Sequence, residues 1–349
     1  MDDNSKFWIS RRRFAQGAAA GAGLVAGMGS WPRFSSAADA GLVALVHTQH
    51  AGDNGPIDSM IAALKKLGAD KGVKTRAIDA ADPAAFESIF KSLGDAGASV
   101  VAATFLEVAE AMKAVAPKYP KTKFIQIFAD PIEPAIANIR TVSYNYYLGA
   151  YLSGYFGAKW TKNAKLGYIG GVSLPPLNAD FNALKAGALA ANPSATAVSA
   201  FAGSFQDPAK GHEIAAQMYG SGVEYIFTDG AATDAGVIQA ANEGADRYTS
   251  SISPAQFKLG PKTVAVLTTL DFGLSLYRNA VDALSPDFKG GHYATGLNDG
   301  VIDFIPSEAF EKEGPPDAVA KMKSIMPEID KLKKDIIAGT LKVPFDTKL

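Results

Sequence analysis

Residues 42–78 read LVALVHTQHAGDNGPIDSMIAALKKLGADKGVKTRAI. An apolar, valine-rich run at 42–48 is followed by an amphipathic stretch at 57–71 and a second β-rich run at 73–78. Short apolar runs predict buried strands, and an apolar repeat of about 3.6 residues predicts a helix. A strand, a helix and a strand in this order are typical of a βαβ unit with parallel strands.

The same alternation continues along the chain in two series. The first series adds strands at 99–104, 123–128 and 139–144 and helices at 84–96 and 106–119. A long helix at 147–160 leads to the second series, with strands at 165–169, 197–201, 224–228 and 247–252 and helices at 179–191, 209–221 and 234–243. The pattern predicts an α/β fold of two doubly wound parallel-sheet lobes.

The last part of the chain is expected to cross back between the lobes. A strand at 263–268 and a helix at 272–284 are predicted to return the chain to the first lobe, before a short strand at 301–305 and a charged helix at 316–338. We therefore expect lobe 1 at 41–163, lobe 2 at 164–262, and a return to lobe 1, hinge and C-terminal segment at 263–349. Several crossings form a hinge, and ligands bind between the carboxyl ends of the strands of such lobes.

Residues 1–40 have the pattern of a targeting segment. Residues 10–14 read SRRRF, a glycine- and alanine-rich stretch follows at 17–29, and the small residues ADA stand at 38–40. This order resembles a twin-arginine export signal, with a disordered basic terminus as the alternative. The stretch is too short for a membrane span, which needs about 20 apolar residues. We expect export to the periplasm.

Composition excludes several classes of site. The chain has no cysteine, so disulfides, thiolate metal sites, cysteine nucleophiles and a lipidated cysteine anchor are absent. A net charge of -1 gives no basic field for nucleic acid. The four histidines, His47, His50, His212 and His292, do not have metal-ligand spacing. Neither a Gly-x-Ser-x-Gly elbow nor a phosphate loop is found, so we predict no metal, no cofactor and no enzyme activity.

Five segments carry a resemblance to a known family. They are APKYP at 116–120, GAYLSG at 149–154, KLGYIGG at 165–171, ANP at 191–193 and GSFQDPAKG at 203–211. Their order and spacing resemble the basic membrane protein family, the nucleoside-binding receptors of ABC transporters. The resemblance implies a fold like that of type I periplasmic binding proteins, an ABC permease in the inner membrane as partner, and aromatic rings that sandwich a purine-like base.

The resemblance also indicates ten candidate ligand-binding residues close to predicted strand ends or at the start of the second lobe's first helix. They are Asp53, Asn54, Phe105, Asn145, Tyr146, Phe181, Phe205, Asp229, Asp271 and Phe272. Most have a structural alternative. Phe181 could be a core residue, Asn145 a helix cap, and Asp53 or Asp229 part of a turn. His47 is expected in the buried strand, His50 could contact ligand, and Asp207 before Pro208 is better explained as a helix cap.

Three departures from the family affect the expected ligand. Pro56 stands where members commonly have an aromatic residue, and Phe205 stands where one branch has tryptophan. Residues 249–253 read TSSIS, where many members have a glycine and an aspartate that hold ribose. Together these changes favour a free base or another flat heterocycle over a complete nucleoside.

The sequence therefore predicts a monomeric receptor that captures a small molecule by hinge closure. Two alternatives remain open. A closed receptor could report to a membrane signalling protein instead of a permease. A periplasmic hydrolase would need a pair of acids in the cleft, and Asp53 and Asp229 could form one.

Overall fold

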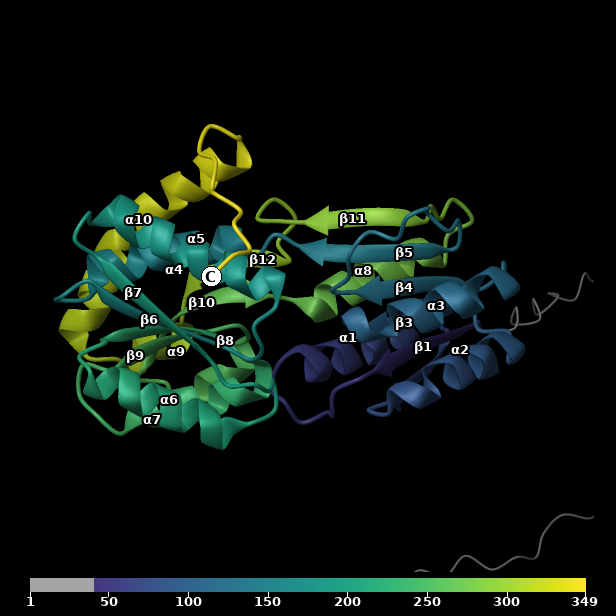
Figure 1. Cartoon of the computed structure of the whole chain (residues 1–349), viewed down its shortest axis with the longest axis horizontal. Helices are drawn as coiled ribbons and strands as arrows, with labels where there is room; N and C mark the ends of the chain where they lie inside the picture. Colours follow the sequence, from purple (N-terminus) through teal and green to yellow (C-terminus); the bar gives the residue numbers. More distant parts are fainter. Residues whose placement is uncertain (1–40) are drawn as a thin grey trace, which may run out of the picture. The chain divides into compact units, whose positions relative to one another are not determined.

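The computed structural model describes residues 41–349, which form two six-stranded sheets (Figure 1). The strand order is β11-β5-β4-β3-β1-β2 in the first sheet and β12-β10-β9-β8-β6-β7 in the second. All pairs are parallel except β10 with β12. The predicted export signal at 1–40 lies outside the described residues.

The first sheet and its helices are built mainly from the start of the chain. The elements are β1 (Leu42–His47), α1 (Pro56–Lys71), β2 (Lys74–Asp79), α2 (Phe86–Asp95), β3 (Val100–Thr104), α3 (Ala109–Val115), β4 (Lys123–Ile127) and β5 (Ile139–Tyr144). Short 3-10 turns occupy Pro83–Ala85, Leu106–Val108 and Ala116–Lys118. The strand β1 is buried from Val43 to His47 because α1 covers one face of the sheet and α2 and α3 cover the other.

The remaining elements follow in chain order. They are α4 (Tyr147–Trp160), β6 (Lys165–Gly170), α5 (Pro175–Ala191), β7 (Thr196–Phe201), α6 (Pro208–Gly220), β8 (Tyr225–Asp229), α7 (Asp234–Asn242), β9 (Tyr248–Ser251), β10 (Val264–Leu270), α8 (Phe272–Ala283), β11 (Gly291–Thr295), β12 (Ile302–Pro306), α9 (Glu308–Glu313) and α10 (Pro316–Ile337). Two more 3-10 turns lie at Ala231–Thr233 and Pro254–Leu259. None of the helices in the described part of the chain is long and apolar enough to cross a membrane.

The helix α4 packs in the second lobe, so the expected lobe boundary at residue 163 is wrong. Two glycines bring α4 and α5 into backbone contact. A β-carbon at Gly154 would lie 1.9 Å from the carbonyl oxygen of Leu184, and one at Gly187 would lie 2.0 Å from that of Tyr151. The sequence shows both glycines but not the partner of each helix, which is why the boundary was placed too late.

The strand β10 also stays in the second lobe, contrary to the prediction that residues from 263 return to lobe 1. It pairs with β9 on one side and with the antiparallel strand β12 on the other. The return is made instead by α8 and by β11, which pairs with β5 in the first sheet (Figure 1). The strand β11 was not predicted, because its residues, GHYAT, are mostly exposed and lack an apolar alternation.

The chain thus passes between the sheets at β5–α4, at β10–α8 and at β11–β12. Hydrogen bonds tie these crossings together. The Tyr146 hydroxyl donates to the carbonyl of Thr268 at 2.8 Å, and the amide of Asp271 donates to the carbonyl of Val301 at 2.8 Å. The crossings form the hinge that the sequence predicts.

Candidate ligand-binding site

A cavity of about 440 Å³ lies between the two lobes, where the carboxyl ends of their strands meet. The first sheet and α8 contribute Gln49, Pro56, Phe105, Leu106, Glu107, Phe128 and Phe272. The second lobe contributes Leu174, Leu177, Phe205, Asp229, Ala231, Ile252 and Leu270. Most of these side chains are apolar, and the charged ones are both acidic. This is the place where doubly wound folds bind their ligands.

Three phenylalanine rings form one wall of the cavity. The ring centre of Phe105 lies 6.1 Å from that of Phe128 and 6.2 Å from that of Phe272, edge to face in each case. Phe128 stacks on Tyr144, which is buried behind it, at 6.2 Å and 15°. Such pairs hold one another in fixed orientations. The wall therefore presents preformed aromatic surface.

Two of these phenylalanines have an unusual backbone conformation, which sets the direction of their rings. Phe105 and Phe128 follow β3 and β4 directly and have positive φ angles of 68° and 58°. A positive φ is strained for a bulky residue and costs about 1–3 kcal/mol. Two hydrogen bonds hold Phe105: its amide donates to the carbonyl of Ile127 at 2.7 Å, and its carbonyl accepts from the side chain of Gln126 at 2.7 Å.

Phe205 lies on the second-lobe side of the cavity, and a glycine makes room for it. A β-carbon at Gly171 would lie 2.2 Å from the Phe205 ring, so only glycine allows the ring to rest on this backbone. Leu174 and Leu177, at the start of α5, continue the same side. The two lobes therefore offer apolar surfaces to one ligand.

Asp229, which lines the cavity, has a second buried carboxyl group as its neighbour. Asp229 ends β8 and accepts a hydrogen bond from the Tyr168 hydroxyl at 2.8 Å. Asp180, from α5, is 4% exposed and lies near enough to Asp229 for the two charges to interact. Burial, followed by the charge of Asp229, raises the pKa of Asp180 well above its usual range. Burial also raises the pKa of Asp229, against the opposing hydrogen bonds from Tyr168 and Asp180. Because two adjacent buried carboxylates repel each other, the pair binds a proton more readily than an isolated carboxylate does.

We expect Asp180→Asn to change how stability depends on pH. The folded state raises the pKa of Asp180, so the folded protein binds the proton more tightly than the unfolded chain. The stabilisation is complete below the ordinary aspartate pKa of about 3.9 and is lost as the pH rises through the folded pKa. Urea unfolding of the empty protein at a series of pH values should therefore show a smaller loss of stability with rising pH in the variant. Parallel profiles would show that Asp180 does not titrate differently on folding.

Four of the ten predicted site residues line the cavity: Phe105, Phe205, Asp229 and Phe272. The cavity also contains Gln49, Glu107 and Phe128, which the sequence prediction missed. Phe128 was assigned to the end of a strand, and its position directly after β4 is the signal that could have identified it. The sequence gives no sign that Glu107 lines the cavity. It lies in a turn whose direction depends on the backbone conformation of Phe105.

The other six predicted residues have structural contacts elsewhere. Asp53 is buried and accepts from the amides of Gly55, Ile57 and Asp58, so it caps the start of α1. The amide of the neighbouring Asn54 donates to Asp58, outside the cavity lining. Asp229 lines the cavity and Asp53 does not.

The remaining four lie at the hinge or in the second-lobe core. Asn145 pairs through its amide with the carbonyl of Thr295, and Tyr146 is buried beside it in the hinge. Phe181 packs against Tyr168, with 5.7 Å between ring centres, as its core alternative predicts. Asp271 caps α8 by accepting from the amide of Leu274 at 2.8 Å. It lines a separate cavity of about 250 Å³ beside the main one.

Two other sequence interpretations can be compared with the structure. His47 is buried as expected, and Asp207 caps α6 by accepting from the amide of Lys210 at 2.9 Å. His50 is exposed, faces Asp79 at 2.7 Å and does not line the cavity. Residues 41–349 contain no cluster of three or more side chains that could hold a metal ion.

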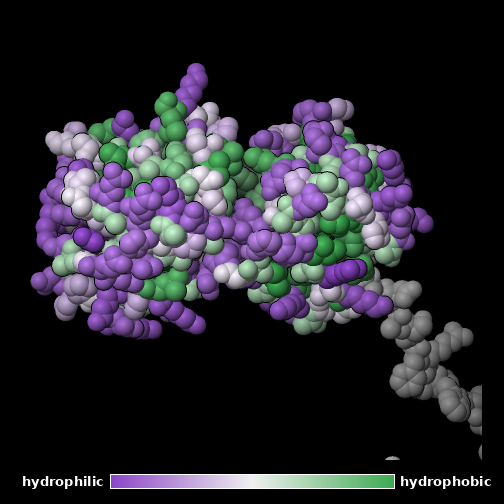
Figure 2. Space-filling view, turned by 60° about the horizontal axis from the view of Figure 1, so that its bottom comes forward, coloured by the Kyte–Doolittle hydropathy of each residue, from purple (hydrophilic) through white to green (hydrophobic). Residues whose placement is uncertain are grey.

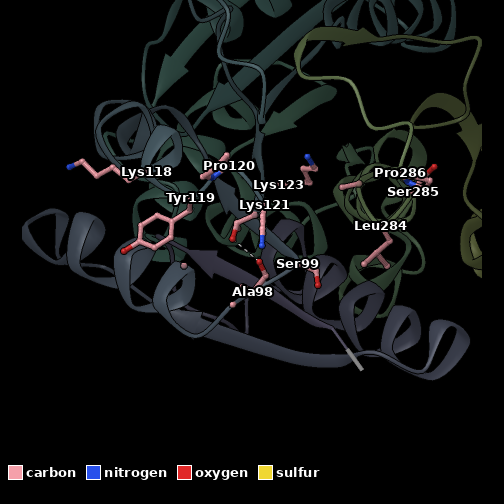
Figure 3. Close-up of a pocket in the computed structure, with 14 residues that line it drawn as sticks. Ala98, Ser99, Lys118, Tyr119, Pro120, Lys121, Lys123, Leu284, Ser285 and Pro286 are labelled. Carbon is pink, nitrogen blue, oxygen red and sulfur yellow. Dashed lines mark hydrogen bonds between the residues drawn. The ribbon is translucent and has the colours of Figure 1, made fainter. Parts of the chain in front are cut away.

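A larger cavity of about 710 Å³ lies at the other end of the first sheet (Figure 3). Ser99 and Lys123 line it at the amino ends of β3 and β4, together with Lys118, Tyr119 and Lys121. It belongs to one lobe and does not face the hinge. Figure 2 shows a largely hydrophilic face with apolar patches between the polar side chains, and such scattered patches are normal for a protein surface. The site between the lobes is therefore the better candidate.

Comparison with known proteins gives consistent results. Basic membrane protein A of Borreliella afzelii is 31% identical over 265 residues, which cover 74% of this chain and 78% of that protein. Basic membrane protein A of Borreliella burgdorferi is 29% identical over 266 residues and covers 74% of each chain.

Solved structures agree in fold. An ABC transporter solute-binding protein from Aeropyrum pernix has a TM-score of 0.75 at 21% identity, and covers 88% of this chain and 94% of that chain. One from Conexibacter woesei has a TM-score of 0.70 at 23% identity, with 88% and 99% covered. The fold is thus that of type I periplasmic binding proteins. The family model described as ABC transporter substrate-binding protein PnrA-like matches residues 41–335, and the chain belongs to this family, whose curated members include the basic membrane proteins.

Proposed function

We propose that this receptor captures a flat nitrogen heterocycle, with a free purine base as the favoured ligand, outside the cytoplasm and presents it to an ABC permease. The supporting observation is the cavity between the lobes, which Phe105, Phe128 and Phe272 line from one lobe and Phe205 and the acidic Asp229 line from the other. A planar ring between aromatic side chains gains dispersion and loses water, while a few polar groups fix its orientation.

The size and charge of the cavity narrow the ligand class. A volume of about 440 Å³ suits a small organic molecule. Glu107 and Asp229 are the charged side chains among its described lining residues, so a phosphate or carboxylate would enter without a counter-charge. Burial of apolar area at about 25 cal/mol per Å² supplies several kcal/mol to a base-sized ring.

The side-chain hydroxyls of β9 already have hydrogen-bond partners within the protein, which supports a free base over a nucleoside as the ligand. Thr249 donates to the carbonyl of Ile226 at 2.9 Å, and the Ser250 hydroxyl accepts from the amide of Thr228 at 3.0 Å. Ser251 donates within its own turn. These three side chains are buried and already hydrogen-bonded, so they do not replace the aspartate that holds ribose in the resembling receptors.

Capture would proceed by closure of the lobes about the hinge, with no chemical step. The side chain of Gln206, in the second lobe, reaches the carbonyl of His50, in the first, at 3.4 Å. Ligand contacts from both lobes favour the closed arrangement, because a ligand shifts the equilibrium toward the state that it binds better. A permease that contacts both lobes requires their surfaces to be exposed, so we propose that the receptor is a monomer.

Phe205→Ala is expected to weaken binding of a flat heterocycle by about 1–3 kcal/mol. The variant removes the aromatic face of the second lobe and leaves the wall of lobe 1 intact. Isothermal titration would measure the change in dissociation constant. Phe345→Ala is the matched control, because Phe345 is 62% exposed and lies outside the cavity lining. Equal affinities in the two variants would show that the Phe205 ring does not contact the ligand.

The function itself is tested by thermal unfolding against free bases, nucleosides, sugars and amino acids. A ligand at 100 times its dissociation constant stabilises the protein by about 2.7 kcal/mol. We expect the largest shifts with free bases. Larger shifts with nucleosides would show that other groups hold the ribose, and shifts with sugars or amino acids alone would contradict the proposal.

A further inference from the structure

The protein holds Asp229 in one orientation at the wall of the cavity. The Tyr168 hydroxyl donates to Oδ2 of Asp229 at 2.8 Å. The Tyr168 side chain is itself fully buried and stacks on Phe227, with 5.7 Å between the ring centres and 11° between the ring planes. The amide of Gly171 donates to the backbone carbonyl of Asp229 at 3.0 Å. Asp229 is therefore fixed through both its side chain and its backbone.

Asp229 keeps the capacity to accept further hydrogen bonds. An ionised carboxylate has about four acceptor positions and no donor, and the Tyr168 hydroxyl uses one of these positions. A hydrogen bond donated to a carboxylate also favours its ionised form. The described residues that line the cavity include no lysine, arginine or histidine. Once closure of the lobes removes water, the ligand itself must therefore supply an N–H donor to Asp229.

The first lobe contributes a side-chain amide to the same cavity. Gln49 follows β1, and its backbone carbonyl accepts from Nδ1 of His47 at 2.8 Å, but its side chain makes no hydrogen bond within the described part of the chain. An amide offers both donors and an acceptor, and it can pair with a donor and an acceptor on one edge of a purine. The other polar lining residue of this lobe, Glu107, is exposed and already accepts from the hydroxyl of Thr48.

We propose, on the basis of the proposed function, that Asp229 accepts a hydrogen bond from the N–H of the ligand's five-membered ring, and that Gln49 pairs with the edge of its six-membered ring. A free purine base has this ring N–H, whereas a nucleoside carries its sugar on that nitrogen. Asp229 is thus the residue that selects a base over a nucleoside. A site that hydrogen bonds an N–H group strongly rejects an analogue without it. The ligand also joins the two lobes, because Asp229 and Gln49 follow strands of different sheets.

The test compares two isomers of methyladenine, which are neutral and have the same number of atoms. 8-Methyladenine keeps the N–H of the five-membered ring, and 9-methyladenine has its methyl group in place of that hydrogen. Isothermal titration calorimetry measures the dissociation constant of each isomer. We expect 8-methyladenine to bind about 10–100-fold more tightly, because 9-methyladenine leaves Asp229 without a donor. Equal affinities, or tighter binding of 9-methyladenine, would overturn the proposal.

Two variants separate the hydrogen bond to Asp229 from a steric effect of the methyl group. Asp229→Asn keeps an oxygen for the Tyr168 hydroxyl but replaces the other oxygen with NH2, so the preference for 8-methyladenine is expected to disappear. Gln49→Met is expected to weaken both isomers by a similar factor and to keep the preference. Gln217→Met is the control, because Gln217 is exposed and does not line the cavity.

An unchanged preference in Asp229→Asn would contradict the role of Asp229. Unchanged affinity for both isomers in Gln49→Met would contradict the role of Gln49. The comparison of the isomers on the unmodified chain still tests the proposal where a variant fails to fold.

The result also separates this inference from the proposed function. Adenine and hypoxanthine are titrated in parallel. If these free bases bind and the two isomers of methyladenine bind equally, the proposed function stands and this inference fails. If no base binds, both fail.

Discussion

Phe272→Ala is expected to lower the free energy of unfolding by about 3–5 kcal/mol and to weaken binding of flat heterocycles in the same protein. Phe272 is 3% exposed and begins α8, at one of the crossings between the lobes. Its ring contacts Tyr144 at 4.9 Å between centres, as well as Phe105 and Phe128. Truncation would leave a void behind the wall of the site and release the rings that Phe272 orients.

Urea unfolding with fluorescence detection measures the stability loss, and calorimetric titration measures the binding loss. Phe345→Ala is again a suitable reference, since truncation of an exposed ring creates no internal void. A loss of stability with unchanged affinity would make Phe272 a core residue only. A loss of less than about 1 kcal/mol would contradict the packing described above.

Gly154→Val is expected to destabilise the protein by about 3 kcal/mol or more, because it separates α4 from α5. Any β-carbon at this position would lie 1.9 Å from the carbonyl oxygen of Leu184, and this oxygen cannot move without the helix backbone. Overpacking against a backbone is costlier than against a flexible side chain. The variant should also expose apolar surface of the second lobe, which a fluorescent dye that binds such surface would detect.

Gly220→Ala is the matched control. Gly220 is the last residue of α6, and a β-carbon there would have no atom within 4 Å. Alanine is favoured over glycine in a helix, so this variant should be neutral or slightly stabilising. Similar thermal unfolding of the two variants would contradict close α4–α5 packing.

The sequence predicted the succession of elements well because each buried strand and each amphipathic helix has its own apolar pattern. Strand β5 and helix α4 begin and end where the pattern places them. The sheet to which each strand belongs was harder to predict, since it depends on contacts between segments that are distant in the sequence. The strand β10 has the same buried, β-branched residues in either lobe, and only its pairing with β9 and β12 decides where it lies.

The site was predicted in part for a similar reason. Phe105, Phe205 and Asp229 were proposed because each follows a strand end, and all three line the cavity, since parallel strands bring their carboxyl ends to one edge. The same rule also selected Asp53, whose carboxylate caps α1 and does not line the cavity. Asp180 was missed because it lies inside a helix, with no local sign that it faces Asp229.

The interleaved order of the strands affects how the protein is made. The first sheet is completed at its edge by β11, Gly291–Thr295, which the ribosome synthesises only after β10 of the other lobe. Until then β5 presents an unpaired edge, and such edges promote association between chains. Neither lobe can finish folding alone during synthesis, so the many long-range pairings should make folding slow and largely post-translational. We therefore expect the nascent chain to be prone to association until β11 and β12 have emerged.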